Sequence, residues 1–260
     1  MSSDDIARKG TAFQKVITDE STSPRKRYQE LFVGRAGVGP LLKYEFLTGI
    51  FGGAPGAFGL WARKTFYRRL FGRVGRGVVL GRAVVLRHPH RIEIGDNVLV
   101  DDGCILDGRG KEGGGPALRI GSGTIVSRNT ILGGKDGLLE IGDRCNFGVD
   151  CLIYSSRGHI VIEECALFGA RCYIGGGRYR YDRLDVPIME QGQYFRGDVV
   201  IERNCWFGAY AMVLDGIRIG HDSIIGANSV VTKDIPPYSI AAGIPAKVLR
   251  KRDGSEQPPA

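Results

Sequence analysis

The 260-residue sequence lacks long hydrophobic runs and closely paired cysteines. Its longest stretch with little charge, residues 49–62, spans fourteen residues and is interrupted by glycine and proline. A helix needs about 20 apolar residues to cross a bilayer, so this stretch is too short and too broken. The first residues, MSSDDIARKGTAFQ, contain no apolar segment like that of a signal peptide. None of the six cysteines forms a C-x-x-C pair. We therefore expect a protein of the reducing cytoplasm.

Charge and glycine are abundant instead. The chain carries 36 basic and 28 acidic residues, a formal net charge of +8, and the basic residues concentrate in its first third. Such a charge fits an anionic partner: a nucleotide cofactor, a phospholipid surface or a nucleic acid. The 40 glycines, in a sequence that is not of low complexity, indicate turns at regular intervals.

A six-residue rhythm of aliphatic or Phe residues runs from Leu80 onward. A small residue stands four places after many of these anchors, and five of the six cysteines occupy that slot. This pattern predicts a parallel β-helix whose large and small residues alternate inward, with the cysteines reduced in its core. The clearest anchor sets are Ile94, Val100 and Leu106; Ile120, Val126 and Leu132; Ile141, Phe147 and Ile153; Ile162, Phe168 and Ile174; Ile201, Phe207 and Val213; and Ile219, Ile225 and Val231.

Surplus residues enter the rhythm at one place in each coil. Three hexads make one triangular coil, and the insertions follow the third anchor of four coils, after Leu106, Leu132, Ile153 and Ile174. They should therefore leave the prism at the same corner and stack into one edge. The largest insertion, residues 175–197, is long enough that we expect a functional loop.

Residues 199–252 carry a resemblance to a known family. The Trp206-Phe207-Gly208 step and the later run VVTKDIPPYSIAAGIPAKV resemble the left-handed β-helix hexapeptide-repeat acyltransferases, which include sugar O-acetyltransferases and xenobiotic acetyltransferases. The hexads extend the likeness back to about Leu80. The resemblance implies an all-β left-handed parallel β-helix, a homotrimer, and an acyl-CoA groove between neighbouring prisms.

The resemblance also implies which residues would meet the donor, acetyl-CoA or another acyl-CoA. Small side chains would let the pantetheine arm approach, and fixed cations would meet the nucleotide phosphates. The positions that match are Ala209, Ala227, Thr232, Lys233, Lys247 and Arg250.

The family's usual general base is a histidine near the start of the long loop, and here it is missing. The matching stretch, residues 176–181, reads GGRYRY, and there is no histidine between residues 161 and 220. His159, in the insertion one coil earlier, is the first candidate for this role, because the repeat places it beside Asp198 where the loop returns. Asp182 or Glu190 in the loop is the second candidate, if burial raised the pKa of the carboxyl.

The remaining histidines fit the role less well. His88 and His90 fall at the same corner several coils away, and Pro89 between them suggests a simple turn. His221 is predicted to face outward on an edge without an insertion. The γ-class carbonic anhydrases share this fold, but the H-x4-H part of their zinc pattern is absent, so we expect no metal site.

The loop combines aromatic and charged side chains in a way that suits a saccharide, because rings stack on sugar faces and charged forks hold hydroxyls. A loop that packs on a neighbouring subunit through the same rings is an equal alternative. The expected substrate contacts are Arg178, Tyr179, Arg180, Tyr181 and Asp185.

The N-terminal part lies outside the resemblance. We expect a flexible segment over residues 1–27 and a helical segment over 28–77, before a β-helix over 78–243 and a C-terminal tail over 244–260. Residues 41–76 mix aromatic, aliphatic and basic side chains, which fits an interfacial membrane segment. A cap on the open first coil is the alternative, and both roles are compatible. Nucleic-acid binding is not expected, because the cations alternate with glycine and large apolar residues.

Together these patterns predict a trimeric transferase that moves an acetyl or other short acyl group from CoA to a hydroxyl or amine of a sugar. The acceptor would be a lipid-linked or polysaccharide precursor at the inner face of the cytoplasmic membrane. The alternative is a non-catalytic trimeric protein of this fold that binds saccharide or acts as a scaffold.

Overall fold

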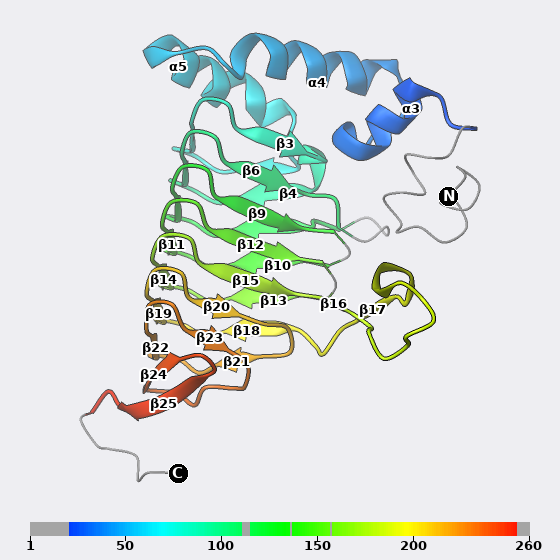
Figure 1. The fold of residues 1–260 in the computed structure, drawn as a ribbon. Coiled ribbons are helices and arrows are strands. Elements are labelled where there is room, and N and C mark those ends of the chain that lie inside the picture. Colours follow the sequence, from blue (N-terminus) through cyan, green and yellow to red (C-terminus); the bar gives the residue numbers. More distant parts are fainter. Residues whose placement is uncertain (1–20, 111–114, 136, 157, 254–260) are drawn as a thin grey trace.

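The protein is a left-handed β-helix with a helical N-terminal segment, as the hexad pattern predicts (Figure 1). The computed structural model describes residues 21–110, 115–135, 137–156 and 158–253. Most of the segment predicted to be flexible, residues 1–27, therefore lies outside the described residues. The chain winds as a triangular prism, and each coil contributes one short strand to each of three parallel sheets.

The three sheets, named A, B and C here, form the three faces of the prism. Sheet A contains β1 (Arg73–Val74), β4 (Ile92–Ile94), β7 (Leu118–Ile120), β10 (Leu139–Ile141), β13 (Ile160–Ile162), β18 (Val199–Ile201) and β21 (Arg218–Ile219). Sheet B contains β2 (Val79–Leu80), β5 (Leu99–Val100), β8 (Ile125–Val126), β11 (Asn146–Phe147), β14 (Leu167–Phe168), β19 (Trp206–Phe207), β22 (Ile224–Ile225), β24 (Ser239–Gly243) and β25 (Ala246–Lys251). Sheet C contains β3 (Val85–Arg87), β6 (Ile105–Asp107), β9 (Ile131–Gly134), β12 (Leu152–Ser155), β15 (Tyr173–Gly176), β20 (Met212–Val213) and β23 (Val230–Val231).

The hexad anchors form the core. Every anchor from Ile94 to Val231 is buried, and the five cysteines of the small slot are buried and free. Coils stack in register, so identical positions lie above one another; Phe147, Phe168 and Phe207 form a continuous stack with 4.7 Å between ring centroids. This distance matches the spacing of neighbouring strands, which is why one phenyl ring per coil fills the column.

The N-terminal helices cover the open first coil (Figure 1). The Tyr44 hydroxyl of α4 donates to the Leu86 carbonyl at 2.7 Å, and the buried Arg63 of α5 donates from Nε to the Leu80 carbonyl at 2.9 Å. The helical elements of this part are α3 (Pro24–Tyr28), the π-helix η1 (Gln29–Val33), α4 (Val38–Phe51), α5 (Gly56–Phe66) and the 3-10 turn η2 (Tyr67–Arg69). The solenoid begins with β1, within the segment expected to be helical. Among the described residues, no helix is both long and apolar enough to span a membrane.

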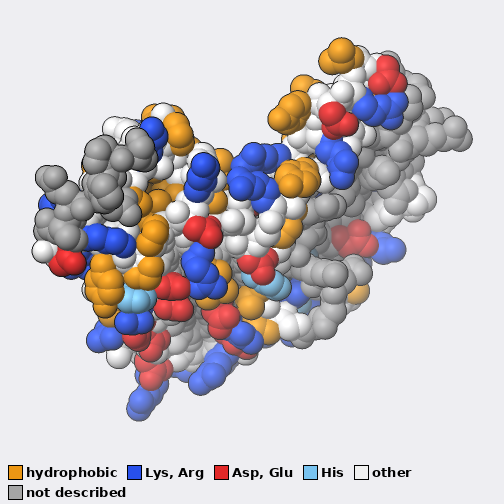
Figure 2. Space-filling model, turned by 90° about the horizontal axis from the view of Figure 1, so that it is seen from below, with side chains coloured by type: hydrophobic (Ala, Val, Ile, Leu, Met, Phe, Trp, Pro, Cys, Tyr) orange, Lys and Arg blue, Asp and Glu red, His pale blue; other side chains and the backbone are white. Residues whose placement is uncertain are grey.

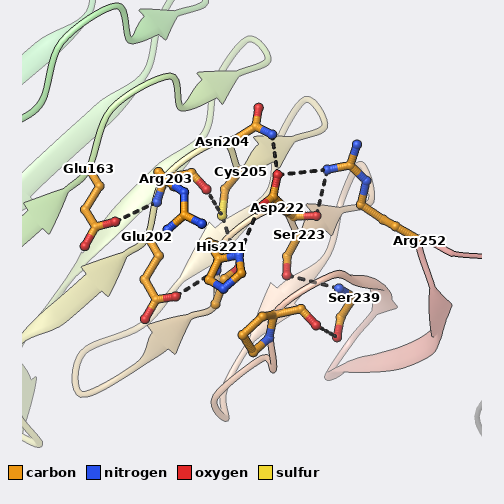
Figure 3. A network of polar contacts seen from close by, with 12 residues as sticks. Glu163, Glu202, Arg203, Asn204, Cys205, His221, Asp222, Ser223, Ser239 and Arg252 are labelled. Atoms are coloured by element: carbon orange, nitrogen blue, oxygen red, sulfur yellow. Dashed lines mark hydrogen bonds and ion pairs between the residues drawn. The ribbon is translucent and has the colours of Figure 1, made fainter.

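The C-terminal end is closed by a hairpin. Strand β25 pairs antiparallel to β24, although its residues were predicted to belong to a tail. A polar network joins this end to the last coils (Figure 3): His221 Nδ1 lies 2.8 Å from Asp222 Oδ2, and Arg252 contacts the Asp222 carboxylate at 3.6 Å. His221 is thus engaged in a structural network rather than free at the surface.

The insertions leave the prism at one corner, where sheet C turns into sheet A, as predicted. This C–A corner carries the 3-10 turn η3 (Pro89–Arg91) in the first coil. Its largest insertion is the long loop of residues 175–197, which projects sideways from the prism (Figure 1). The loop contains the short antiparallel pair β16 (Arg178–Tyr179) and β17 (Gln193–Tyr194) and the 3-10 turn η4 (Ile188–Glu190).

Candidate active site

The long loop is an ordered hairpin with its own hydrogen bonds. The Gln191 side chain donates to the carbonyls of Arg183 and Val186 at 2.7 and 2.8 Å and accepts from the Arg183 N–H. Arg183 forms an ion pair with Asp185, which holds the pKa of that carboxyl below its usual range. The five loop residues predicted to contact substrate are all exposed, and none of them enters the prism core.

A cavity of about 340 Å³ lies on the outer face of sheet C and extends to Gly176, where the loop begins. Aliphatic side chains form its floor, and polar and aromatic side chains form its rim. This mixture is typical of pockets that hold a small polar molecule. The lining residues are Arg87, Ile105, Asp107, Arg109, Ile131, Leu152, Tyr154, Ser156, Tyr173 and Gly176.

A buried carboxylate organises the rim of this cavity. Asp107 is 2% exposed. Its Oδ2 accepts a hydrogen bond from Arg109 Nη2 at 2.6 Å and another from the Tyr154 hydroxyl at 3.3 Å. Arg109 also donates to the Tyr154 oxygen at 3.1 Å. Burial, and then the charge of Asp107, raises the pKa of Tyr154 to about 12, so the phenol stays protonated. Gly133 lies between Asp107 and Tyr154 in sheet C, and because it has no side chain, the Asp107 and Tyr154 side chains can meet across it.

A second buried carboxylate, Asp215, lies where the loop joins the prism. It follows β20 and is 1% exposed. Its Oδ2 accepts the Arg196 N–H at 2.8 Å, and Arg178 Nε lies 3.5 Å from its Oδ1. Asp215 therefore contacts both ends of the loop, at the first residue of β16 and at the return toward β18. Burial, and then the Asp215 charge, raises the pKa of the neighbouring Tyr173.

His159 lies beside Asp198, as the repeat predicts. The backbone N–H of His159 donates to Asp198 Oδ1 at 2.8 Å, and its ring Nδ1 accepts the Leu138 backbone N–H at 3.2 Å. Because Nδ1 accepts, the neutral ring carries its proton on Nε2. In this arrangement the exposed imidazole offers a donor, whereas a general base needs a free lone pair.

The loop carboxylates Asp182 and Glu190 lie away from the buried cluster. Asp182 is exposed, and Glu190 is half-buried at the end of η4. Neither side chain makes a hydrogen bond or ion pair with another described residue, and both would move with the loop rather than with the prism. Their placement is compatible with contact to a bound molecule.

His88 and His90 occupy the first coil, under η1 and far along the prism from the loop. His88 Nε2 lies 2.8 Å from the Glu30 carbonyl. Burial, followed by the charges of Arg35, His88 and Arg91, lowers the pKa of His90 to about 4. Burial also lowers the pKa of His88. These two rings belong to the packing between the N-terminal segment and the prism.

The residues matched to the donor site fall on two edges of the prism. Ala209 and Ala227 follow sheet B strands, at the corner where sheet B turns into sheet C. Thr232 and Lys233 lie at the C–A corner, where Arg196 Nη1 approaches the Thr232 carbonyl at 3.5 Å. Within one chain these two pairs do not line a common groove.

The two remaining donor residues lie on the C-terminal hairpin. Lys247 and Arg250 belong to β25, opposite Ala242 and Ile240 of β24, and both are exposed. Basic and acidic side chains alternate over the surface seen from this end of the molecule (Figure 2).

A larger cavity of about 640 Å³ lies on the outer face of sheet A. Its centre is a ladder in which Arg119 pairs with Glu93 at 3.3 Å and with Glu140 at 3.5 Å. Its described lining contains no aromatic residue, and its five acidic side chains outnumber its two arginines, which does not suit an anionic donor. We therefore centre the candidate site on sheet C, beside the loop.

Sequence reasoning missed Asp107, Arg109, Tyr154 and Asp215. A signal was present for Asp215: the second position after the third anchor holds Gly, Gly, Ser and Gly in the four preceding coils, and then Asp. A charged residue in a column of small ones indicates a special role. The contact of Asp107 with Tyr154 had no such signal, because it depends on the space above Gly133.

Comparisons with known proteins agree with the architecture. The family model described as bacterial transferase hexapeptide (six repeats) matches residues 198–233. A Mycobacterium tuberculosis protein described as a probable acetyltransferase is 34% identical over 135 residues, which cover 52% of this chain and 44% of that protein. The galactoside O-acetyltransferase of Lactococcus lactis is 34% identical over 134 residues, which cover 45% of this chain and 65% of that protein. The chain thus spans less than two thirds of these relatives.

A solved structure shares the fold over most of the chain. The polySia-specific acetyltransferase NeuO aligns with a TM-score of 0.55 and 19% identity, over 73% of this chain and 79% of that chain. The chain is thus similar to hexapeptide-repeat transferases at residues 198–233 and to acetyltransferases over about half of its length.

Proposed function

We propose that this protein is an acyl-CoA-dependent acyltransferase that moves an acetyl or other short acyl group to a hydroxyl or amine of a sugar. A lipid-linked or polysaccharide precursor is the proposed acceptor. The observation that carries the proposal is the cavity on sheet C, which opens beneath the long loop and next to the coils matched by the family model. The acetyltransferase relatives support the reaction type.

The acceptor side of the site would be the sheet C cavity closed by the loop. The fixed guanidinium of Arg109 and the phenol of Tyr154 offer donors to sugar oxygens, and their orientation is held by Asp107. Tyr173 adds an aromatic surface. The loop would then approach from above with the five predicted contacts, Arg178, Tyr179, Arg180, Tyr181 and Asp185.

The donor side would be completed by a neighbouring chain. The small residues Ala209 and Ala227 lie on one edge of the prism and Thr232 and Lys233 on another, which supports a groove shared between two protomers of a homotrimer. Lys247 and Arg250 are exposed cations on the adjoining hairpin and suit the nucleotide phosphates of CoA. The acyl-CoA thioester supplies the acyl group, so one general base suffices for the chain's own chemistry.

His159, Asp182 and Glu190 are proposed to contact the acceptor or to take part in proton transfer. The His159 Nε2–H would donate to an acceptor oxygen and fix its orientation. Asp182 and Glu190 would accept hydrogen bonds from sugar hydroxyls when the loop closes over the cavity.

The experiment that tests this function is calorimetric titration of the purified protein with acetyl-CoA and with free CoA. We expect saturable binding at about one site per chain, weakened by Lys247→Ala and by Arg250→Ala. Free CoA should bind because the nucleotide provides most of the charge contacts. No saturable binding of either ligand would contradict the transferase and favour a saccharide-binding scaffold of this fold.

We also propose that the N-terminal end of the prism rests on a membrane surface. On α4 the residues that face away from the first coil are apolar and lie at a spacing of four: Val38, Leu42, Phe46 and Ile50, between 52% and 62% exposed. On α5, Phe58 and Trp61 are similarly exposed. An apolar outward stripe of this kind needs a partner.

Charge supports a lipid partner over a second copy of the same end. Residues 21–76 hold eleven of the 36 basic residues and two of the 28 acidic ones, so this segment is strongly positive and the rest of the chain nearly neutral. Two such ends would repel each other, whereas anionic lipid attracts them. In a homotrimer with parallel prisms, all three ends would face the same way and bind together.

The membrane proposal is tested by flotation with vesicles. The protein should float with vesicles that contain about 30% anionic lipid and less with purely zwitterionic ones, and added salt should weaken the binding. Protein that stays at the bottom of the gradient with both vesicles would contradict the proposal.

A further inference from the structure

Two acids are buried among the described residues, and their surroundings differ. Asp107 receives the Arg109 backbone N–H at 3.0 Å, the Arg109 guanidinium and the Tyr154 hydroxyl, so both of its oxygens are occupied. Asp215 receives one hydrogen bond, from the Arg196 N–H to Oδ2. Its Oδ1 is buried, and no donor among the described residues makes a hydrogen bond to it.

An unpaired carboxylate oxygen in a buried site is costly. Leaving a buried acceptor without a donor costs about 1–3 kcal/mol, and more for a charged group. Native structures rarely keep such a group without a reason, and a catalytic role is one of the recognised reasons. The Arg178 Nε, 3.5 Å away, balances the charge of Asp215 but leaves the lone pairs of Oδ1 unused.

The position of Asp215 matches the chemistry that the site needs. Gly176 lines the sheet C cavity and packs directly on Asp215; a Cβ atom at residue 176 would lie 2.8 Å from the carboxyl carbon. Glycine at this position therefore lets the buried carboxylate lie directly beside the edge of the cavity. Arg178 also belongs to the stretch in which related sugar acetyltransferases carry their loop histidine, which is missing here.

We propose that Asp215 is the general base of the acyl transfer and that its Oδ1 takes the proton of the acceptor hydroxyl. This inference rests on the proposed function. The hydroxyl oxygen attacks the thioester carbonyl carbon, a C–O bond forms and the C–S bond breaks. The electron pair of that bond leaves on the CoA sulfur, and the proton held by Asp215 passes to this thiolate, so the carboxylate is restored. No oxidant, reductant or metal takes part in this balance.

The neighbours of Asp215 fit the role. The Arg196 N–H fixes Oδ2 and so orients Oδ1. The Arg178 side chain is 42% exposed, so it can move aside for an acceptor without unpacking the core. Arg178 is a positioning residue, because its Nε lies 3.5 Å from Oδ1 and helps to orient the carboxylate. Tyr173 is a second ionisable side chain that faces Asp215.

The test compares Asp215→Asn with wild type. Asparagine still accepts the Arg196 N–H but cannot take a proton. We expect the Kd for acetyl-CoA to stay within about twofold and the turnover number to fall at least about a hundredfold. Release of the CoA thiol is followed with p-nitrophenyl galactoside as the acceptor and with water alone. Asp143→Asn is the matched control, because its exposed carboxylate also accepts a backbone N–H, from Ser122 at 2.6 Å, on another edge.

Each outcome separates this inference from the proposed function. Wild-type protein that does not bind acetyl-CoA overturns the proposed function. Wild-type protein that binds acetyl-CoA but never accelerates thioester cleavage overturns both the transferase and its base, whereas Asp215→Asn that keeps more than about a tenth of the turnover overturns the role of Asp215 alone.

A second variant serves if Asp215→Asn does not fold, as judged by its melting curve. Arg178→Gln changes an exposed side chain and removes the cation beside the carboxylate. Because the carboxylate then loses its positioning partner, turnover should fall at least about tenfold while the Kd for acetyl-CoA stays within about twofold. Turnover within about twofold of wild type would show that another group is the base.

Discussion

The apolar stripe on α4 makes a quantitative prediction for membrane binding. Leu42 and Phe46 are 62% and 60% exposed, so a little over half of each side chain is available to a lipid surface. Full burial of a Leu or Phe side chain stabilises by about 1.5–3 kcal/mol. The two together should contribute about 2 kcal/mol, which corresponds to about a thirtyfold change in partitioning.

The perturbation is the double variant Leu42→Ser, Phe46→Ser, measured by titrating anionic vesicles in a flotation or sedimentation assay. Both positions point away from the core, so the melting temperature should change little. The matched control is Leu184→Ser with Ile244→Ser, which removes two apolar side chains that are 100% and 74% exposed elsewhere. The control should bind vesicles as the wild type does.

The reasoning would be refuted by either of two results. If wild-type protein binds vesicles and the α4 variant binds within about twofold of it, the stripe is not the contact surface. If the α4 variant and the control lose binding equally, exposed apolar residues act without regard to their place on the molecule, and the capped end has no special role.

Other predictions concern stability and ligand binding. Phe168→Ala interrupts the phenyl stack and should lower the free energy of unfolding by about 3–5 kcal/mol in urea titrations, whereas Leu167→Ala, at an exposed position of the same strand, should cost less than about 1 kcal/mol. The folded-state pKa of His90, about 4, lies below the unfolded value near 6.5, so the unfolded chain binds more protons between these values. The contribution of His90 to stability is therefore fully present above about pH 6.5 and is lost as the pH falls toward 4. His90→Asn should reduce the fall in melting temperature over this range. Tyr154→Phe should raise the acceptor KM about tenfold with little change in acetyl-CoA affinity, measured by steady-state kinetics and calorimetry. Lys247→Ala should weaken CoA about tenfold but leave the binding of acetyl-pantetheine, which lacks the nucleotide, unchanged.

The repeat allowed the sequence to predict the prism and the corner of the insertions. Because each coil returns to the same register, Ile162 of one coil stacks on Ile201 of the next, and this register alone predicts that His159 lies beside Asp198. Periodicity also explained the buried cysteines. Local rules suffice where every coil repeats the same contacts.

The parts that break the repeat could not be predicted in the same way. The pairing of β25 with β24 depends on a turn after the last coil, and the hexads give no information about it. The cluster of Asp107, Arg109 and Tyr154 joins residues from different coils through space left by a glycine, so no spacing in the sequence indicates it. The sequence also cannot predict that Oδ1 of Asp215 lacks a hydrogen-bond donor while Oδ2 accepts the Arg196 N–H, because this depends on the folded positions of both.

The central claim, transfer of an acyl group from CoA to a sugar, is tested most directly by mass spectrometry of acceptors. The purified protein is incubated with acetyl-CoA and a panel of sugars that includes galactosides and lipid-linked saccharides. The account predicts at least one acceptor whose mass increases by one acetyl group, with an equal amount of free CoA released. Saturable binding of both a saccharide and acetyl-CoA, with no acetylated product and no CoA released, would contradict it and leave a binding protein of this fold.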